Sequence, residues 1–412
     1  MFAFGRAAVG RLGRLPIGAV GVASCGIALH RQHSECHAHH PPPRDERLAA
    51  LEQRLELLEA DIASRYGIEK TTGQADAVFS WDEGLTAAFP DECKPHEVDM
   101  HGGFSEDPST GKIYTGIPGC GLFEISADLT AWRRIGTDPR LKANIHGLAV
   151  FSHDGATSIA LAQNDAERVL ITNLDGHVVQ QLDRPCGGEF RNDEVNAYYS
   201  ERRQSRPAGA KTFCCTDVTY LHGRLYVVTG YSEGDFVLTA THQQGQWMWG
   251  GAAPGEGVAW GGRGDVGGRF RTAHGVYAHD DHVYVANREA FQVIKFTPTG
   301  QLVEVLPEVP RGARICNVSH AERHAYFVFN ALAPLGGHDG LPSTAARTAP
   351  IYFHSGRELV SVVEPGRLGI PILKHIHHVH PHYAPDGTLY LLVHGWRDGK
   401  YAVLRHVNQR AQ

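Results

Sequence analysis

Residues 269–300 read RFRTAHGVYAHDDHVYVANREAFQVIKFTPTG. After the histidine at position 274 come two alternating runs, GVYA and HVYVA, then QVIKF, and the segment ends at the turn TPTG. Alternating β-branched and aromatic residues between turn residues are typical of β-strands. We interpret these residues as one blade of a β-propeller, with the histidine at the start of its innermost strand.

The same pattern occurs in units with a period of roughly 40 to 60 residues. The units begin at Met100, Ile145, Cys215, Ala273, Cys316 and His377. After residue 68 the predicted strands are short and bounded by DG, TG and GG turns, without long helical periodicity. Such repeats favour a ring of four-stranded blades. The sequence therefore predicts an all-β, six-bladed β-propeller over residues 75–408, with an irregular β-sandwich as the alternative.

Composition excludes some classes of function. The chain has 412 residues, a formal net charge of −6 and no long basic run, so we expect no nucleic-acid partner. Its 8 cysteines are too few and too scattered for a disulfide scaffold, and they leave the redox compartment open. Histidine is unusually frequent, with 26 residues, many of them near predicted inner-strand starts. We therefore expect the functional residues to be found among the histidines.

Residues 1–44 have the composition of a targeting segment. They are rich in arginine, carry no acidic residue before Glu35, contain an apolar run at 17–29 and end in a His-rich tail. Spread arginines without acidic residues predict a mitochondrial transit peptide. The apolar run is too short for an ordinary spanning helix, but it suits a signal-peptide core or a membrane association. We expect a mitochondrial location, with the secretory pathway or a membrane anchor as alternatives.

Residues 45–68 predict an amphipathic helix. Its apolar residues fall at the a and d positions of a heptad: Leu48, Leu51, Leu55, Leu58 and Ile62. A helix this short is marginal alone. We expect residues 45–66 either to form a coiled coil, with a second copy or a protein partner, or to dock on the propeller.

Histidines at the inner-strand starts suggest a metal site. In a propeller these positions line one central cavity, and reading them through the six units gives His101, His146, Thr216, His274, Asn317 and His378. Alternate blades supply His146, His274 and His378, so three imidazoles converge and leave an open position, as in a catalytic zinc site. His101 could be a hydrogen-bonding neighbour. The last unit also carries His377, His380 and His382, which leaves the third ligand less certain than the others.

The motif order resembles a known family. The chain contains HGLAV at 146, FCCTDV with YVVTGYSEGDF, GRFRTAHGV with VANREAFQVIKF, ARICNVS with YFVFNAL, and IHHV with PDGTLYL. These units look like NHL-type repeats, and over much of residues 140–405 their order is similar to peptidyl-α-hydroxyglycine α-amidating lyases. Each motif alone is weak, and the order with the three histidines is more specific.

The resemblance implies a lyase site. It implies a zinc ion bound by His146, His274 and His378, with Tyr231 as proton acceptor. The implied substrate is a small molecule or a peptide that ends in α-hydroxyglycine. Cleavage of its carbinolamide C–N bond would release glyoxylate. A metal that binds the substrate hydroxyl would lower its pKa and make a tyrosine base plausible. Arg288 matches a family arginine and could hold the substrate carboxylate, or it could only hold a loop.

The chain departs from this family at several positions. The matching first-blade segment, KIYTGIPGCG, lacks the family's arginine. The acidic residue that binds a structural calcium appears as Val379, so calcium is not expected. Ser232 replaces a cysteine, so Cys214 lacks its disulfide mate. Two other functions stay open: a non-catalytic NHL-type scaffold or interaction protein with at most a structural metal, and a lactonase-like hydrolase, which would need several axial carboxylates.

Overall fold

A computed structural model describes most of the chain after residue 68. The described residues are 69–201, 211–251, 253–306, 313–332, 349–370, 375–396 and 400–407. The predicted targeting segment, residues 1–44, and the predicted helix, residues 45–68, lie outside this set. The transit peptide, the coiled coil and the mitochondrial location therefore stay predictions.

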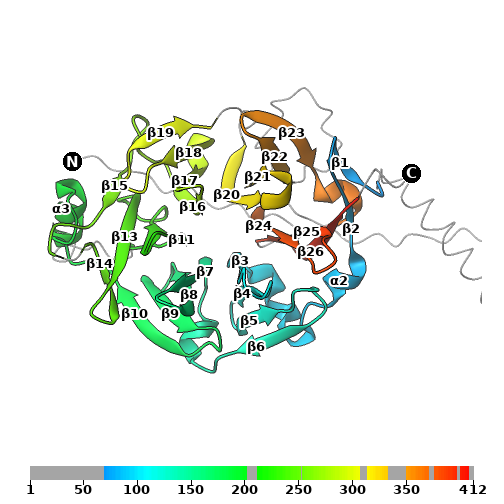
Figure 1. Cartoon of the computed structure of the whole chain (residues 1–412), viewed down its shortest axis with the longest axis horizontal. Helices are drawn as coiled ribbons and strands as arrows, with labels where there is room; N and C mark the ends of the chain where they lie inside the picture. The colour runs from blue at the N-terminus through cyan, green and yellow to red at the C-terminus, as the bar shows by residue number, and fades with distance from the viewer. Residues whose placement is uncertain are drawn as a thin grey trace, which may run out of the picture. The chain divides into compact units, whose positions relative to one another are not determined.

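The described strands form six antiparallel sheets arranged in a ring, which confirms the predicted six-bladed β-propeller (Figure 1). The first blade consists of β3 (Phe104–Glu106), β4 (Ile113–Ile117), β5 (Gly121–Ile125) and β6 (Trp132–Ile135). The second consists of β7 (Gly147–His153), β8 (Ala156–Gln163), β9 (Arg168–Asn173) and β10 (Val178–Asp183). The third consists of β11 (Asp217–Leu221), β12 (Arg224–Val228), β13 (Phe236–Gln243) and β14 (Gln246–Trp249), with β15 (Ala259–Gly261) also paired to β13.

The other three blades follow the same order from the innermost strand outward. The fourth consists of β16 (Ala273–His279), β17 (His282–Asn287), β18 (Gln292–Phe296) and β19 (Leu302–Val305). The fifth consists of β20 (Arg314–Ala321), β21 (Tyr326–Leu332), β22 (Ile351–Ser355) and β23 (Glu358–Val363). The sixth begins with β24 (Ile376–Tyr383), β25 (Leu389–Gly395) and β26 (Tyr401–His406).

The sixth blade is completed by the earliest described strands. β2 (Ala77–Trp81) pairs antiparallel with β26, and β1 (Thr72–Gln74) pairs with β2. Figure 1 shows these two strands on the outer side of the sixth blade, with β1 next to β23 of the fifth. The innermost strands of all six blades contact one another in turn, and β24 contacts β3. Pairing between the two ends of the sequence thus closes the ring.

The hydrophobic core lies between neighbouring blades. One cluster of buried side chains joins Phe151 of β7 to Val218 of β11 and Phe236 of β13. Because alternate residues of a strand face opposite sides of its sheet, each blade can bury one face against each neighbour. Burying both faces in this way explains why these strands contain nearly continuous apolar runs.

Few helices accompany the sheets. They are α2 (Glu83–Ala87) and α3 (Asp193–Glu201), with 3₁₀ segments at η1 (Asp91–Asp99), η2 (Pro139–Lys142), η3 (Arg288–Ala290), η4 (Glu322–His324) and η5 (Pro365–Leu368). Asp82 caps α2 by accepting a hydrogen bond from the backbone N–H of Leu85. Among the described residues, no helix combines the length and the apolar character that a membrane span requires.

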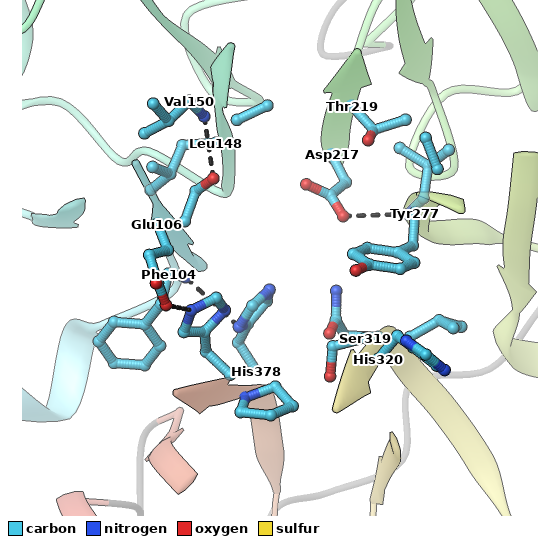
Figure 2. Close-up of a pocket in the computed structure, with 18 of the residues that line it drawn as sticks. Phe104, Glu106, Leu148, Val150, Asp217, Thr219, Tyr277, Ser319, His320 and His378 are labelled. Atoms are coloured by element: carbon cyan, nitrogen blue, oxygen red, sulfur yellow. Dashed lines mark hydrogen bonds and ion pairs between the residues drawn. The ribbon is translucent and has the colours of Figure 1, made fainter. Parts of the chain in front are cut away.

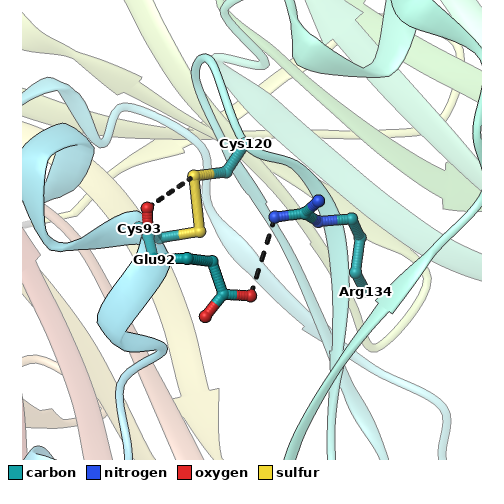
Figure 3. Close-up of a disulfide and its surroundings, with 4 residues drawn as sticks. All are labelled: Glu92, Cys93, Cys120 and Arg134. Atoms are coloured by element: carbon teal, nitrogen blue, oxygen red, sulfur yellow. Dashed lines mark hydrogen bonds and ion pairs between the residues drawn. A yellow bond between two sulfur atoms is a disulfide. The ribbon is translucent and has the colours of Figure 1, made fainter.

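A disulfide joins η1 to the first blade (Figure 3). It links Cys93 to Cys120, which lies between β4 and β5, across a sequence separation of 27 residues. Beside it, Glu92 and Arg134 form an ion pair at 3.6 Å. The sequence correctly predicts that cysteines do not form the main framework, but it did not identify this pair because the spacing matches no familiar motif.

Candidate metal centre

β-bulges direct side chains toward the axis at the start of three inner strands. In β16, β20 and β24 the pairing register skips one residue, and the skipped residues are His274, Cys316 and His377. A bulge inserts an unpaired residue and changes the direction of its side chain. These residues therefore do not follow the simple alternation of a strand.

Four buried imidazoles gather at this level, and we call them the histidine group: His101, His146, His274 and His377. The ring centroid of His377 lies 4.6 Å from those of His101 and His146 and 4.8 Å from that of His274. The nitrogen atoms offered by His101, His146 and His377 all lie within 4.8 Å of one another. The group could therefore hold a metal ion.

The third predicted ligand, His378, does not join the group. The structure brings His146 and His274 together, as predicted, but the third ring beside them belongs to His377. His378 instead accepts a hydrogen bond at Nδ1 from the backbone N–H of Phe104, at 3.3 Å. Its ring lies so close to Gly103 that a Cβ there would approach it to 2.8 Å. The bulge separates the two histidines, because adjacent strand residues point to different environments.

The sequence contains a signal that identifies the correct residue. A histidine two positions before a buried apolar strand residue occurs in three blades, as His146–Leu148, His274–Val276 and His377–Val379. The same spacing places Cys316, rather than the predicted Asn317, at the equivalent position of the fifth blade. Aligning the units on the apolar residue would therefore have selected His377.

Hydrogen bonds determine which nitrogens of the group are available. Nδ1 of His146 lies 2.5 Å from the carbonyl oxygen of Thr216, and Nδ1 of His274 lies 2.7 Å from that of Cys316. A carbonyl can only accept, so both Nδ1 atoms carry the proton and both Nε2 atoms keep a lone pair. Backbone partners of this kind orient metal-ligating imidazoles in proteins.

Some of these nitrogens lack any partner within the described part of the chain. Nε2 of His146 and both ring nitrogens of His377 are buried without a hydrogen bond. Buried polar atoms are normally paired, and one nitrogen from each of His101, His146 and His377 lies within 4.8 Å of the others. The residues present therefore fit a divalent metal with imidazole ligands.

Burial keeps the group uncharged. It lowers the pKa of His146 to about 3 and drives the pKa values of His274 and His377 well below the usual imidazole value. His146, His274 and His377 are each only 2% exposed. Neutral imidazole is the form that binds a metal, so near pH 7 no proton would have to leave before an ion enters.

Tyr231 and Arg288 lie together beside His274, where the resemblance places its catalytic residues. The Tyr231 hydroxyl is 2.9 Å from Nε2 of His274, and Nη1 of Arg288 donates to the Tyr231 oxygen at 2.8 Å. Because Nε2 of His274 has the free lone pair, the Tyr231 hydroxyl donates to it. Burial raises the pKa of Tyr231 to about 12, and the charge of Arg288 opposes this rise.

Residues without a predicted role also border the group. The indole of Trp396 stacks on His101 with centroids 4.4 Å apart, and the His375 ring lies 5.4 Å from that of His377. Nδ2 of Asn144 lies 3.3 Å from Nδ1 of His101. Asn144 and His375 come from segments between blades, and Trp396 follows β25 within the sixth blade, where the repeat pattern carries no signal.

The departures from the resembled family are visible in the structure. Cys214 is a buried free thiol, and its backbone N–H donates to Oγ of Ser232 at 2.7 Å. Ser232, which stands where the resembled family has a cysteine, is thus hydrogen-bonded to Cys214. Ile117 belongs to the first-blade segment that lacks the family's arginine, and it is buried. The first blade contributes His101 to the histidine group instead, from the segment before β3.

A separate cavity of about 550 Å³ begins one layer beyond the histidine group (Figure 2). Its wall includes His378 and Asp217, and its far end includes Glu106, whereas no member of the histidine group lines it. Asp217 accepts hydrogen bonds from the backbone N–H groups of Val218 and Val276, at 2.8 and 3.0 Å. Burial nevertheless raises the pKa of Asp217 to about 7.

Comparisons with known proteins identify no family for this chain. No family model matches the chain, and no curated protein matches it. Two similar solved structures are crystal structures of BBS1N in complex with ARL6DN, soaked with mercury or with lead. The first is 13% identical, with a TM-score of 0.39 over 73% of this chain and 77% of that chain. The second is 11% identical, with a TM-score of 0.38 over 72% and 75%. Similarity this low carries no argument about function.

Proposed function

We propose that the protein is a metal-dependent lyase that cleaves the C–N bond of a carbinolamide at the histidine group. The observation that carries the proposal is the position of the Tyr231 hydroxyl. It lies between Arg288 and Nε2 of His274, near Nε2 of His146 and the nitrogens of His377, which have no hydrogen-bond partner among the described residues. A hydroxyl held between a cation and a proton acceptor, next to a potential ion site, is suited to proton transfer.

The ligands we propose are His101, His146 and His377, because their nitrogens converge. His274 is left for Tyr231, with which it already forms a hydrogen bond. Three neutral imidazoles suit zinc, and the first-row metals near it in the affinity series. When bound, zinc would supply Lewis-acid chemistry that lowers the pKa of a nearby hydroxyl group.

Tyr231 and His274 would act together as the proton acceptor. The Tyr231 oxygen takes the hydroxyl proton of the α-hydroxyglycine, while its own proton passes to Nε2 of His274. The electron pair left on the substrate oxygen forms the C=O bond, the C–N bond breaks, and the leaving amide nitrogen takes the proton held by Tyr231, to which the proton on Nε2 of His274 then returns. The products are glyoxylate and an amide, and the reaction requires no oxidant or reductant.

Arg288 would connect substrate binding to this proton transfer. Burial and the charge of Arg288 keep the pKa of His274 well below its usual value. A substrate carboxylate paired with the guanidinium would offset that positive charge, and it would make His274 a better acceptor. The planar guanidinium also suits a carboxylate as small as that of glyoxylate. Arg288 would thus bind the substrate carboxylate in place of the arginine that the first blade lacks.

One observation favours a second function, a non-catalytic propeller with a structural metal. The histidine group is almost fully buried, with His101 the most exposed member at 8%. Structural metal sites are typically closed, whereas catalytic sites keep a position open to substrate. The indole of Trp396 stacks on His101 and would have to move aside to open that side of the group to a substrate.

Activity and metal content together test the proposal. Wild type and a His146→Ala/His377→Ala variant are compared for metal retained after gel filtration and for glyoxylate released from an N-acyl-α-hydroxyglycine. We expect the variant to lose one equivalent of metal and all glyoxylate release. Equal metal in both proteins would remove the metal site. Metal retained by a wild type that releases no glyoxylate would favour the structural alternative.

A second pair of variants tests the division of roles within the group. We expect His101→Ala to weaken zinc binding at least 10-fold, as loss of a direct ligand should. We expect His274→Ala to keep the metal while lowering kcat. The opposite result, metal loss in His274→Ala alone, would make His274 the ligand and His101 its neighbour, and it would leave Tyr231 without the relay proposed above.

A further inference from the structure

A second group of possible metal ligands lies outside the axis, between the second and third blades. We propose that His153, Asp154 and His242 form a solvent-accessible site for a divalent transition-metal ion. Their ligand atoms all lie within 4.8 Å of one another, and the two imidazole centroids are 4.9 Å apart. This site is independent of the histidine group and of the lyase function proposed for it.

A tight turn fixes two of the ligands. His153 ends β7 and pairs with Ala156 at the start of β8, so Asp154 and Gly155 form a two-residue hairpin turn. Both turn residues have positive φ, 48° for Asp154 and 78° for Gly155. Aspartate and glycine are the residues that tolerate such a turn. The carboxylate of Asp154 consequently lies 3.3 Å from Nε2 of His153.

The third ligand comes from the neighbouring blade. His242 lies on β13 and pairs across the sheet with Trp247 of β14. The Trp247 ring packs against both imidazoles, with centroids 5.1 Å from His153 and 5.4 Å from His242. An ion held here would therefore connect β7 of the second blade to β13 of the third.

Neighbouring side chains orient the ligands before any ion arrives. The hydroxyl of Tyr220 lies 3.1 Å from Nδ1 of His153, which leaves Nε2 directed toward Asp154. Contacts of this kind, which hold the second nitrogen of an imidazole, raise the precision and affinity of metal sites. Tyr220 and Trp247 would therefore support the site without binding the ion themselves.

The ligand set indicates the kind of ion. Two imidazoles and one carboxylate suit Zn²⁺, Cu²⁺ or Ni²⁺, whereas Ca²⁺ and Mg²⁺ prefer oxygen ligands alone. The Asp154 side chain is 80% exposed and that of His153 is 21% exposed. Water can therefore complete the coordination, and the ion should exchange with solvent more readily than one bound at the histidine group.

Calorimetric titration with Ni²⁺ tests the proposal in the full chain, after zinc has been supplied to the axial site. Wild type is compared with His242→Gln and with Asp154→Asn. The matched control is His222→Gln, because His222 forms an exposed pair with Asp281 at 2.7 Å but belongs to no three-ligand group within the described residues. Histidines of residues 30–40 add the same background to every protein.

We expect wild type and His222→Gln to bind one more equivalent of Ni²⁺ than His242→Gln, and Asp154→Asn to bind that equivalent at least 10-fold more weakly. We also expect Cu²⁺ to quench tryptophan fluorescence in wild type more than in a Trp247→Phe variant. Equal Ni²⁺ stoichiometry and affinity in wild type and His242→Gln would overturn the proposal. Glyoxylate release does not enter this test, so failure of the lyase proposal would leave it intact.

Discussion

The histidine group and the cavity beyond it are neighbours along the same inner strands, but only the cavity adds carboxylates to its imidazoles. The group holds neutral imidazoles, some with unpaired nitrogens. The cavity holds carboxylates that are already hydrogen-bonded, as Asp217 is to two backbone N–H groups. His377 and His378 are adjacent in sequence and belong one to each region. The comparison shows that one residue along a bulged strand separates a candidate ion site from a hydrogen-bonded wall.

The two regions also differ in how they respond to charge. Burial, assisted by the positive charge of Arg288, keeps the pKa values of His146 and His274 low and these imidazoles uncharged. At the far end of the cavity, Glu106 lies 2.8 Å from Nδ1 of His382 and 3.4 Å from Nε2 of His380. Burial would raise the pKa of Glu106, but hydrogen bonds from His380 and His382 outweigh this effect and lower its pKa to about 2. Glu106 is thus held in its charged form, whereas burial opposes charge on the histidine group.

The largest expected difference concerns the two adjacent histidines. We expect His377→Ala to lose the axial metal and all lyase activity, because it removes the ring at the centre of the group. His378→Ala should retain the metal while losing roughly 1–3 kcal/mol of unfolding free energy, since it leaves the N–H of Phe104 without its acceptor. Metal analysis and urea denaturation measure both effects. Metal loss in His378→Ala alone would restore the sequence-based ligand set.

Two half-buried tyrosines distinguish the regions by activity. Tyr231→Phe should lower kcat by about 10²- to 10⁴-fold with the metal retained, because it removes the proton acceptor. Tyr277 lines the cavity, so Tyr277→Phe serves as the matched control and should change kcat less than 10-fold. Steady-state kinetics of glyoxylate release makes the comparison. Similar losses in both variants would mean that the hydroxyl of Tyr231 has no special part.

Acid should weaken the metal-free protein through the histidine group first. The pKa of His146 is about 3 in the folded protein and about 6.5 when unfolded. Between these values only the unfolded chain binds the proton. The free energy of unfolding therefore decreases by about 1.4 kcal/mol for each unit by which the pH is lowered, for each such imidazole. His146→Ala should reduce this slope by about 1.4 kcal/mol per pH unit, the contribution of one imidazole. Urea denaturation between pH 7 and pH 4 measures the slope. An unchanged slope would contradict the neutral state of His146.

The smallest effect should come from Glu106, and it should appear at lower pH. Because its pKa is depressed to about 2, its stabilising contribution is present above about pH 4.5 and is lost as the pH falls toward 2. Glu106→Gln should therefore lower stability by about 1–2 kcal/mol at neutral pH, and the difference from wild type should vanish near pH 2. A difference that persists there would show that packing, not charge, holds His380 and His382.

Local sequence patterns were enough to predict the blades. Strand alternation and turn residues repeat with each unit, and each blade forms largely from residues close together in the chain, so six units and their approximate limits could be read from local pattern. The sixth blade is the exception. β2 pairs with β26, far along the chain, and β1 pairs with β2, and no local pattern indicates a partner about 325 residues away.

The candidate site divides in the same way. Sequence alone determined that histidines occupy inner-strand starts on alternate blades and named His146 and His274, and the family resemblance added Tyr231 and Arg288; the structure brings these four together. The spacing that favours His377 over His378 has a meaning only once the bulge is known, and only the tertiary structure placed His101 of the first blade beside them. The physical reason is that residue spacing specifies position along a strand, whereas a bulge and the packing of neighbouring blades decide where a side chain points.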